Sequence, residues 1–450
     1  MSSISHAPHN AAEVAERDVR RQHQASHAPV APNEIAVGVV IGRASEYFDF
    51  FTYGIASVLV FPSVFFPFLN QVDGILLAFT IFSFAFIARP FGTTIFMAIQ
   101  RHFGRSTKLT ASLFLLGTST VCIAFLPANT TGGYGVIVIL GLLRFLQGIA
   151  LGGSWDGLPS LLALNAPKNR RGWFAMLGQL GAPTGFLIAG SLFLFLHTQL
   201  SQEDFLGWGW RYPFFVAFAI NVVALFARLR LVVTEEYTQA LEEWVLEPIG
   251  TIDLVHSQGY NLFIGAFAAL ASYALFHLVT VFPLSWIAIN QSQSINNVLI
   301  VQLVGALVAI LATVASGVIA DKIGRRNTLG TMAVLIGLFA LATPMLLNGG
   351  RFAQDTFLVL GFALLGLSYG QAAGTVTANF EKRVRYTGAA LTTDFAWLIG
   401  AAFAPLVALG LSYRFGLIAV SAYLLSGVVC TLLALRINKS LEAPRPKATL

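Results

Sequence analysis

Long runs of apolar residues alternate with short polar breaks along the chain after residue 33. Most runs approach or exceed the roughly 20 residues that an α-helix needs to cross the hydrocarbon core of a bilayer. We therefore expect an all-α membrane protein. The pattern predicts twelve transmembrane helices, at 35–60, 74–98, 108–127, 134–158, 170–197, 211–231, 259–288, 295–320, 327–347, 354–378, 386–411 and 415–436.

Polar segments divide these twelve helices into two equal groups. Residues 1–33 lack the apolar stretch of a signal peptide, and we expect a disordered tail there. The longest internal polar stretch, 232–258, is expected to be a linker between six-helix bundles at 34–231 and 259–437, and 438–450 is expected to form a second tail. The predicted architecture is two six-helix pseudo-repeats around a central cavity.

Composition supports a bilayer as the main solvent. Hydrophobic residues make up 56% of the chain and charged residues only 11%, with a mean hydropathy of +0.73. These values exclude a soluble nucleic-acid-binding protein, a secreted disulfide scaffold and a disordered chain. Of the 27 Lys and Arg residues, 21 fall in the tails and in the loops on one side of the predicted membrane. This bias predicts that both termini are cytoplasmic, and it explains the basic pI near 9.4 without nucleic acid.

The two predicted halves repeat a short loop. Span two is followed by Phe103-Gly-Arg-Ser-Thr-Lys108, and span eight by Asp321-Lys-Ile-Gly-Arg-Arg326. Each places a glycine and clustered cations in a tight turn. An internal repeat of this kind is typical of transporters whose two halves rock about a central site.

Several motifs resemble the major facilitator superfamily, over the whole chain after the tail. The run from Gly317 to Arg326 is similar to that family's G-x-x-x-D-[RK]-x-G-[RK]-[RK] loop, and Arg144-Phe-Leu-Gln-Gly148 to its fourth-helix motif. More narrowly, Glu46-Tyr-Phe-Asp-Phe50, Arg89-Pro-Phe-Gly92 and Arg383-Val-Arg-Tyr-Thr-Gly388 resemble the metabolite:proton symporters. The resemblance implies a bacterial inner-membrane protein that imports a small polar metabolite with protons.

Four positions depart from the pattern of that family. Arg101 stands where the first-half loop should carry an acid, and Arg43 stands where the first helix usually has Asn. The fourth helix has Ser154 and Asp156 in a stretch that usually reads G-G-E-W-G-G. In the family the loop acid helps to close the cytoplasmic side, so these changes bear on the gate.

Ionisable residues inside the predicted spans are the candidates for proton coupling, because charge in a bilayer is costly and is retained mainly for function. Arg43, Glu46, Asp49 and Tyr53 share a broad face of span one, and Arg144 lies at a matching depth in span four. We expect Arg144 to meet Asp49 or Glu46, one of which takes up a proton before Arg144 turns to the substrate. A static ion pair is the alternative. Asp394 is a further candidate whose partner the sequence does not name.

Polar and aromatic residues facing the cavity are the candidates for substrate binding. They are Arg43, Tyr53, Arg144, Gln147, Tyr273, His277 and Gln371. Span seven corresponds to span one in the repeat, so its Tyr273 and His277 should line the cavity, and Pro283 can bend it. Packing between helices is the alternative for His277 and for the amide side chains.

Charged residues near the predicted cytoplasmic ends are the candidates for gating. They are Arg89, Asp156, Asp321, Arg325, Arg326 and Arg385. Asp156 lies close in sequence to Lys168, Arg170 and Arg171, so pairing at a gate is the expected role there.

Two intramembrane arginines, Arg43 and Arg144, favour an anionic ligand, since a guanidinium binds a carboxylate in a bidentate manner. The first hypothesis is therefore proton symport of a small carboxylate, with an aromatic ring as an option. Uptake of an osmolyte such as betaine or proline, proton-driven efflux, and a transport-inactive sensor are the alternatives. No nucleophile elbow, metal-binding helix or phosphate loop is present in the sequence, so we expect neither an enzyme nor a cofactor or metal. The expected partners are the substrate, protons and lipid, and the expected state is a monomer.

Overall fold

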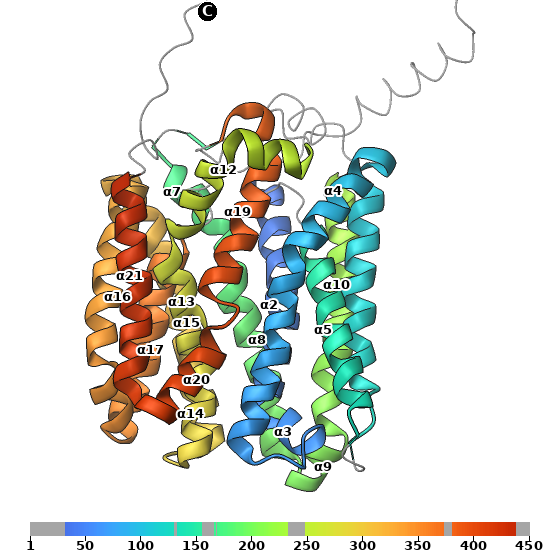
Figure 1. Cartoon of the computed structure of the whole chain (residues 1–450), viewed down its shortest axis with the longest axis vertical. Helices are drawn as coiled ribbons and strands as arrows, with labels where there is room; N and C mark the ends of the chain where they lie inside the picture. Colours follow the sequence, from blue (N-terminus) through green and yellow to red (C-terminus); the bar gives the residue numbers. More distant parts are fainter. Residues whose placement is uncertain are drawn as a thin grey trace, which may run out of the picture.

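The computed structural model describes residues 32–129, 133–154, 166–167, 169–232, 248–372 and 380–437. These residues form a bundle of long helices arranged in two groups, which lie side by side in Figure 1. Several predicted features lie outside the described residues: the gating candidate Asp156, most of the linker (233–247), and both tails apart from residues 32 and 33.

The first group contains the helices from α2 to α10. Their bounds are α2 Pro32–Leu59, α3 Phe61–Val64, α4 Gln71–Ala124, α5 Gly135–Gly153, α7 Arg171–Leu177, η1 Gly178–Leu180, α8 Gly181–Gln199, α9 Gln202–Gly207, η2 Gly209–Arg211 and α10 Tyr212–Val232.

The second group contains the helices from α12 to α21. Their bounds are α12 Thr251–Phe267, α13 Leu270–Thr280, α14 Phe282–Asn290, α15 Ile295–Ile323, α16 Arg325–Asn348, α17 Arg351–Tyr369, η3 Lys382–Val384, α19 Arg385–Gly400, α20 Ala404–Phe415 and α21 Leu417–Ile437.

Ten helical segments of the described chain are long and apolar enough to span a membrane. One of them, α4, contains both predicted spans two and three. Its backbone leaves the helical region at Gly104, between these two spans, so α4 counts as two spanning segments. The helix α2 is also long enough, but it carries Arg43, Glu46 and Asp49 and so falls outside the ten. With α4 counted twice and α2 included, the twelve-helix arrangement in two repeats is confirmed.

The helix breaks repeat between the two groups. Helix α2 ends one residue before Phe61-Pro62, and α13 ends shortly before Phe282-Pro283. A proline in the first helical turn is tolerated, because its missing N–H would have no partner there. The bend expected at Pro283 therefore lies between α13 and α14. Span eleven, predicted as one helix, is divided into α19 and α20 by residues 401–403.

Two turns at one end of the bundle depend on glycine. Gly104 has φ 85° and Gly324 has φ 84°, a region that side chains with a Cβ rarely adopt. The turn within α4 and the junction of α15 with α16 lie at the end that is uppermost in Figure 1, which we call the turn end.

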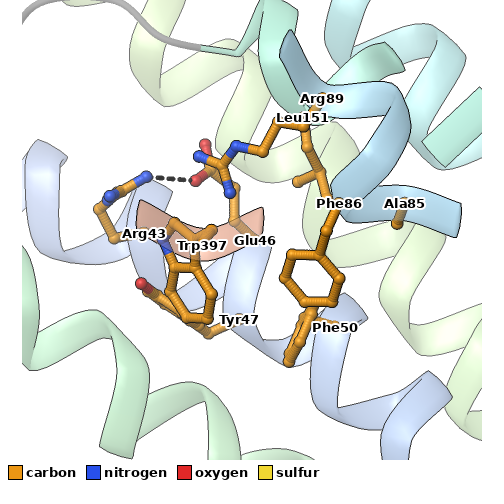
Figure 2. Close-up of a pocket in the computed structure, with 9 residues that line it drawn as sticks. All are labelled: Arg43, Glu46, Tyr47, Phe50, Ala85, Phe86, Arg89, Leu151 and Trp397. Atoms are coloured by element: carbon orange, nitrogen blue, oxygen red, sulfur yellow. Dashed lines mark hydrogen bonds and ion pairs between the residues drawn. The ribbon is translucent and has the colours of Figure 1, made fainter. Parts of the chain in front are cut away.

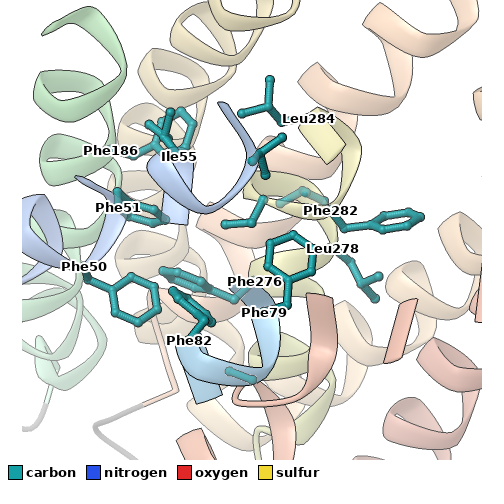
Figure 3. Packing of buried hydrophobic residues seen from close by; sticks show 14 of the residues in the cluster. Phe50, Phe51, Ile55, Phe79, Phe82, Phe186, Phe276, Leu278, Phe282 and Leu284 are labelled. Atoms are coloured by element: carbon teal, nitrogen blue, oxygen red, sulfur yellow. The ribbon is translucent and has the colours of Figure 1, made fainter. Parts of the chain in front are cut away.

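Aromatic side chains fill the space between the two groups. Phe50 and Phe51 of α2 meet Phe276 and His277 of α13, with ring centroids 5.2–5.6 Å apart in the Phe51–Phe276 and Phe50–His277 pairs. Figure 3 shows this cluster continuing through Phe82, Phe186 and Phe282. The layer is continuous with the wall of a cavity described next.

Candidate functional site

A small, partly open cavity lies between the two groups, where α2, α4, α5 and α19 face one another. Figure 2 shows charged side chains on one part of its wall and rings on the other. The residues that line it are Arg43, Glu46, Tyr47, Phe50, Ala85, Phe86, Arg89, Leu151 and Trp397.

Glu46 is held between two guanidinium groups. Arg43 Nη1 donates to its Oε2 at 2.8 Å, and Arg228 Nη2 donates to its Oε1 at 2.7 Å. Arg228 also donates to the carbonyl of Ser154 at 3.3 Å, so this triad joins α2, α5 and α10 within the first group. All three charged side chains are buried.

A second ion pair crosses between the groups. Arg89 Nε on α4 lies 2.6 Å from Asp394 Oδ1 on α19. Thr93, one turn after Arg89, donates from Oγ1 to the other carboxylate oxygen of Asp394 at 2.5 Å. The partner of Asp394 that sequence reasoning left open is therefore Arg89, a residue expected to act in gating.

Asp49 and Arg144 are joined through intermediate side chains. Thr120 lies 2.8 Å from both oxygens of Asp49 and accepts a hydrogen bond from Gln147 Nε2 at 2.7 Å. Gln147 Oε1 in turn accepts from Arg144 Nη1 at 3.0 Å. Within the described residues, the expected meeting of Arg144 with Asp49 or Glu46 is thus a relay rather than an ion pair.

The guanidinium of Arg144 is surrounded by rings. Its Cζ lies 4.1 Å from the ring centroid of Tyr53, 4.8 Å from that of Phe82 and 5.5 Å from that of Phe50. Cation–π contacts of this kind stabilise a desolvated cation by about 2 kcal/mol. Nη2 of Arg144 and the hydroxyl of Tyr53 have no hydrogen-bond partner among the described residues.

His277 and Tyr273 lie in the aromatic layer beside the cavity. His277 is fully buried, and within the described chain neither of its ring nitrogens has a partner. The ring of Tyr273 is 5.1 Å from that of Trp397 and 5.7 Å from that of Tyr369. The hydroxyls of Tyr47 and Tyr369 share a short hydrogen bond, which joins α2 of the first group to α17 of the second.

Gln371 lies away from the cavity. Its Nε2 is 3.2 Å from the carbonyl of Gly172 and 3.2 Å from Ser316 Oγ. These bonds match the helix-packing alternative for this residue more closely than substrate contact.

Contacts at the turn end tie the second group to the first. Asp321 accepts hydrogen bonds from the backbone N–H of Gly172 at 2.6 Å and of Trp173 at 3.2 Å, in the first turn of α7. Arg325 donates to the carbonyl of Arg171 at 3.0 Å. Two other gating candidates bond to carbonyls of the second group, Arg326 to that of Leu435 at 2.9 Å and Arg385 to that of Phe380 at 3.3 Å.

The equivalent contact in the first group uses different side chains. Arg101, which lies three residues before Gly104 as Asp321 does before Gly324, is exposed. Instead, buried Lys108 lies 3.2 Å from the hydroxyl of Tyr386, and both bond to Gln100 Oε1 at 3.1 Å. This cluster joins α4 to α19.

Several residues of the site escaped sequence reasoning, among them Arg228, Trp397 and Thr120. Arg228 is one of the 21 cations that the sequence assigns to the tails and loops on one side, although its spacing of seven from Asn221 places both on the face of α10 that contacts Ser45 and Glu46. Trp397 follows Asp394 by three residues, so it shares that face of α19. Thr120 carried no signal, since isolated threonines are common in membrane helices.

Among the described residues around the cavity and the relay, four arginines and three acids are buried or half-buried. The arginines are Arg43, Arg89, Arg144 and Arg228, and the acids are Glu46, Asp49 and Asp394.

Comparisons with known proteins agree with this architecture. A family model described as Major Facilitator Superfamily matches residues 41–398. The chain is 36% identical over 423 residues to the inner membrane metabolite transport protein YhjE of Escherichia coli, covering 92% of this chain and 96% of that protein. It is 29% identical to the shikimate transporter of Escherichia coli (91% and 95% covered) and 26% identical to the proline/betaine transporter of Salmonella typhimurium (80% and 74% covered).

A solved structure shares the fold. The proton:xylose symporter XylE, bound to 6-bromo-6-deoxy-D-glucose, superposes with a TM-score of 0.70 at 17% identity, covering 90% of this chain and 94% of that one.

Proposed function

The chain belongs to the major facilitator superfamily, and we propose that it imports a small organic anion together with protons by alternating access. The family and the relatives are transporters of metabolites rather than enzymes. The protein is accordingly a multi-pass membrane secondary transporter. The substrate, the coupling ion and the direction are the parts that we propose.

The observation that carries the anion is the pair of guanidinium groups on the cavity wall. Arg43 and Arg89 both line the cavity, and Nε of Arg43 has no hydrogen-bond partner within the described chain. A carboxylate can accept from guanidinium N–H groups in a bidentate manner. Beside Glu46, which is paired with Arg43 and Arg228, the rest of the wall is formed by the rings of Tyr47, Phe50, Phe86 and Trp397 and by Ala85 and Leu151, which suits a carboxylate that carries an apolar or cyclic body.

For proton coupling we favour Asp49 over Glu46. Glu46 already has two guanidinium partners, so its negative charge is matched within the first group. Asp49 makes no ion pair in the described chain and reaches Arg144 only through Thr120 and Gln147. A proton on Asp49 would therefore change the charge that balances Arg144 without breaking a buried ion pair.

We also propose that the membrane is the bacterial inner membrane, that both termini are cytoplasmic and that the functional unit is a monomer. The turn end would then face the cytoplasm. The six-plus-six division at the segment 232–258 and the gating roles of Asp321, Arg325 and Arg89 belong to the same proposal.

Contacts between the groups occur at the turn end, at the centre, and at the opposite end, where His197 Nδ1 lies 2.6 Å from Asn296 Oδ1. Transport would require breaking them in alternation.

Proton-driven uptake into proteoliposomes tests the proposal. An inward proton gradient should drive accumulation of at least one of shikimate, benzoate, lactate and succinate, and a protonophore should abolish it. Asp49→Asn should lose accumulation but keep exchange of internal for external carboxylate. Asp355→Asn, at a position outside the cavity, is the matched control and should behave as wild type. Accumulation by Asp49→Asn would contradict the assignment of this residue.

Uptake of a quaternary-ammonium osmolyte is the second candidate, because the four rings of the cavity wall could also contact a cationic methylammonium group. Glycine betaine and proline therefore belong in the same panel. Accumulation of these compounds alone would retain symport but leave Arg43 and Arg89 with structural roles. Movement of protons in the opposite direction to the substrate would indicate efflux, and carboxylate binding without flux would indicate a sensor.

A further inference from the structure

The ion pair between Arg89 and Asp394 closes one wall of the cavity. Arg89 lines the cavity and its side chain is 11% exposed, whereas Asp394 lies behind it and is 4% exposed. The guanidinium therefore faces the cavity while an internal carboxylate occupies it at 2.6 Å. A substrate carboxylate that reached Arg89 would meet a site already filled by a group of its own kind.

Thr93 can hydrogen-bond to Asp394 whether or not the carboxyl of Asp394 carries a proton. Its hydroxyl has one hydrogen and two acceptors within reach, Asp394 Oδ2 at 2.5 Å and the carbonyl of Gly152 at 3.2 Å. When Asp394 is ionised, Thr93 donates to it. When Asp394 is protonated, it can donate to Thr93, which then donates to Gly152. Both forms of the carboxyl are hydrogen-bonded without moving the backbone.

We propose that Asp394 acts as an internal substitute for the substrate carboxylate on Arg89, and that it leaves Arg89 to the substrate by taking up one proton. This inference rests on the proposed transport of a carboxylate. It makes Arg89 a substrate-binding residue and couples each bound carboxylate to one proton at a site distinct from Asp49.

The exchange balances in charge and in protons. Before binding, Arg89 and Asp394 form a neutral pair. The substrate arrives as an anion, one proton from solution binds Asp394, and the products are a neutral Arg89–carboxylate pair and a neutral carboxyl. Without the proton, Asp394 would be a buried carboxylate that has lost its ion-pair partner, which is strongly unfavourable.

The charged and titratable groups around Asp394 come from several helices. Arg89 on α4 is its direct partner, Arg43 on α2 acts on it at longer range, and Tyr273 on α13 is within electrostatic reach. The titratable side chains of α12, which also packs on α19, are Asp253, His256 and Tyr260, and all three are exposed. Among the described groups, Arg89 is thus the cation that directly balances the charge of Asp394. If Arg89 turns to the substrate, a proton on Asp394 has to replace that balance.

The same exchange would loosen the two groups of helices. Arg89 belongs to the first group and Asp394 to the second, so the pair is a bond between them. Substrate binding would replace this bond by one to a mobile ligand. The Gln100–Lys108–Tyr386 cluster, eight residues before Asp394 on α19, would still join α4 to α19.

Carboxylate binding as a function of pH tests the proposal on purified full-length protein, with shikimate, benzoate, lactate and succinate as the probes. For wild type, Kd for a bound probe should rise about tenfold per pH unit wherever Asp394 is ionised in the free protein, because one proton is taken up per ligand. Asp394→Asn should bind the probe more tightly than wild type at pH 8. The slope of log Kd against pH should be smaller by one for this variant than for wild type. Asp355→Asn, on α17 and outside the cavity lining, should match wild type.

Two variants at Thr93 keep the test informative should Asp394→Asn fold poorly. Thr93→Ser keeps the hydroxyl and should retain the wild-type pH dependence. Thr93→Val removes a hydrogen bond that is stronger to the ionised carboxylate than to the carboxyl, so probe binding at high pH should strengthen about fivefold to tenfold.

The outcomes separate this inference from the proposed function. Wild type that accumulates a carboxylate with protons, beside an Asp394→Asn variant that keeps the full pH dependence of binding, would overturn the exchange and leave the proposed function intact. Wild type that neither binds nor accumulates any of the four probes would overturn both.

Discussion

Glu46 should be far more important to stability than either of the arginines that hold it. Its two oxygens lie 2.8 Å from Arg43 and 2.7 Å from Arg228, and all three side chains are buried. Glu46→Gln would remove the carboxylate that both buried guanidinium groups contact. Removing one partner from a buried ion pair costs about 3–5 kcal/mol, because the remaining charge is not compensated.

Arg228→Met is the matched comparison. After this change Glu46 and Arg43 still form a neutral pair, so the loss at Glu46 is a hydrogen bond with a charged donor, about 1.5–3 kcal/mol. The double variant Glu46→Gln/Arg228→Met removes one of the two cations that contact the missing carboxylate. It should therefore be more stable than Glu46→Gln alone, although it carries one more substitution.

Thermal unfolding of detergent-purified protein, followed by tryptophan fluorescence, measures these differences. The expected order of midpoints is wild type, Arg228→Met, the double variant and Glu46→Gln, from highest to lowest. The coupling between the two sites follows from the double-mutant cycle. A Glu46→Gln variant as stable as wild type, or purely additive effects, would refute the view that charge compensation holds this triad together.

Three further changes have defined outcomes. Gly148→Ala should lower the unfolding midpoint by an amount equivalent to about 1–3 kcal/mol, because its Cβ would lie 2.2 Å from the carbonyl oxygen of Ala85, whereas Gly410→Ala, with open space around it, should not. Tyr47→Phe removes the hydroxyl bond to α17, worth about 1 kcal/mol, and should increase labelling of a cysteine placed in the cavity wall. Asp321→Ala removes the acceptor for two N–H groups of α7 and should increase labelling from the turn end only; equal labelling from both ends would contradict this.

The fold was largely predictable from the sequence because each span buries its own backbone hydrogen bonds and is recognised by its apolar length. The twelve spans, the break at Pro283 and the turn glycines required no knowledge of distant contacts. The division of span eleven at residues 401–403 was missed, because the break lies within an uninterrupted apolar run.

The site was predictable as a set of residues but not as a set of pairs. Asp49, Glu46, Arg144 and Asp394 were identified because ionisable side chains are rare in apolar helices. Their partners depend on how two groups of helices pack. Arg89 and Asp394 are 305 residues apart in sequence, and no local spacing relates them. Arg228 was misplaced because the positive-inside rule treats a cation near a helix end as a loop residue.

The two halves agree at the turn-end glycines but not at the residue three positions before them. Gly104 and Gly324 adopt nearly the same backbone angles, φ 85° and ψ 170° against φ 84° and ψ 149°, yet the residue three positions earlier is Arg101 in one copy and Asp321 in the other. A backbone shape that only glycine accepts easily is difficult to replace, whereas a side-chain contact can be replaced whenever a neighbouring group takes over its task. In this chain the Gln100–Lys108–Tyr386 cluster joins α4 to α19 beside the turn that carries Arg101 instead of an acid. The two turns thus share a backbone conformation, whereas the side-chain contacts beside them differ.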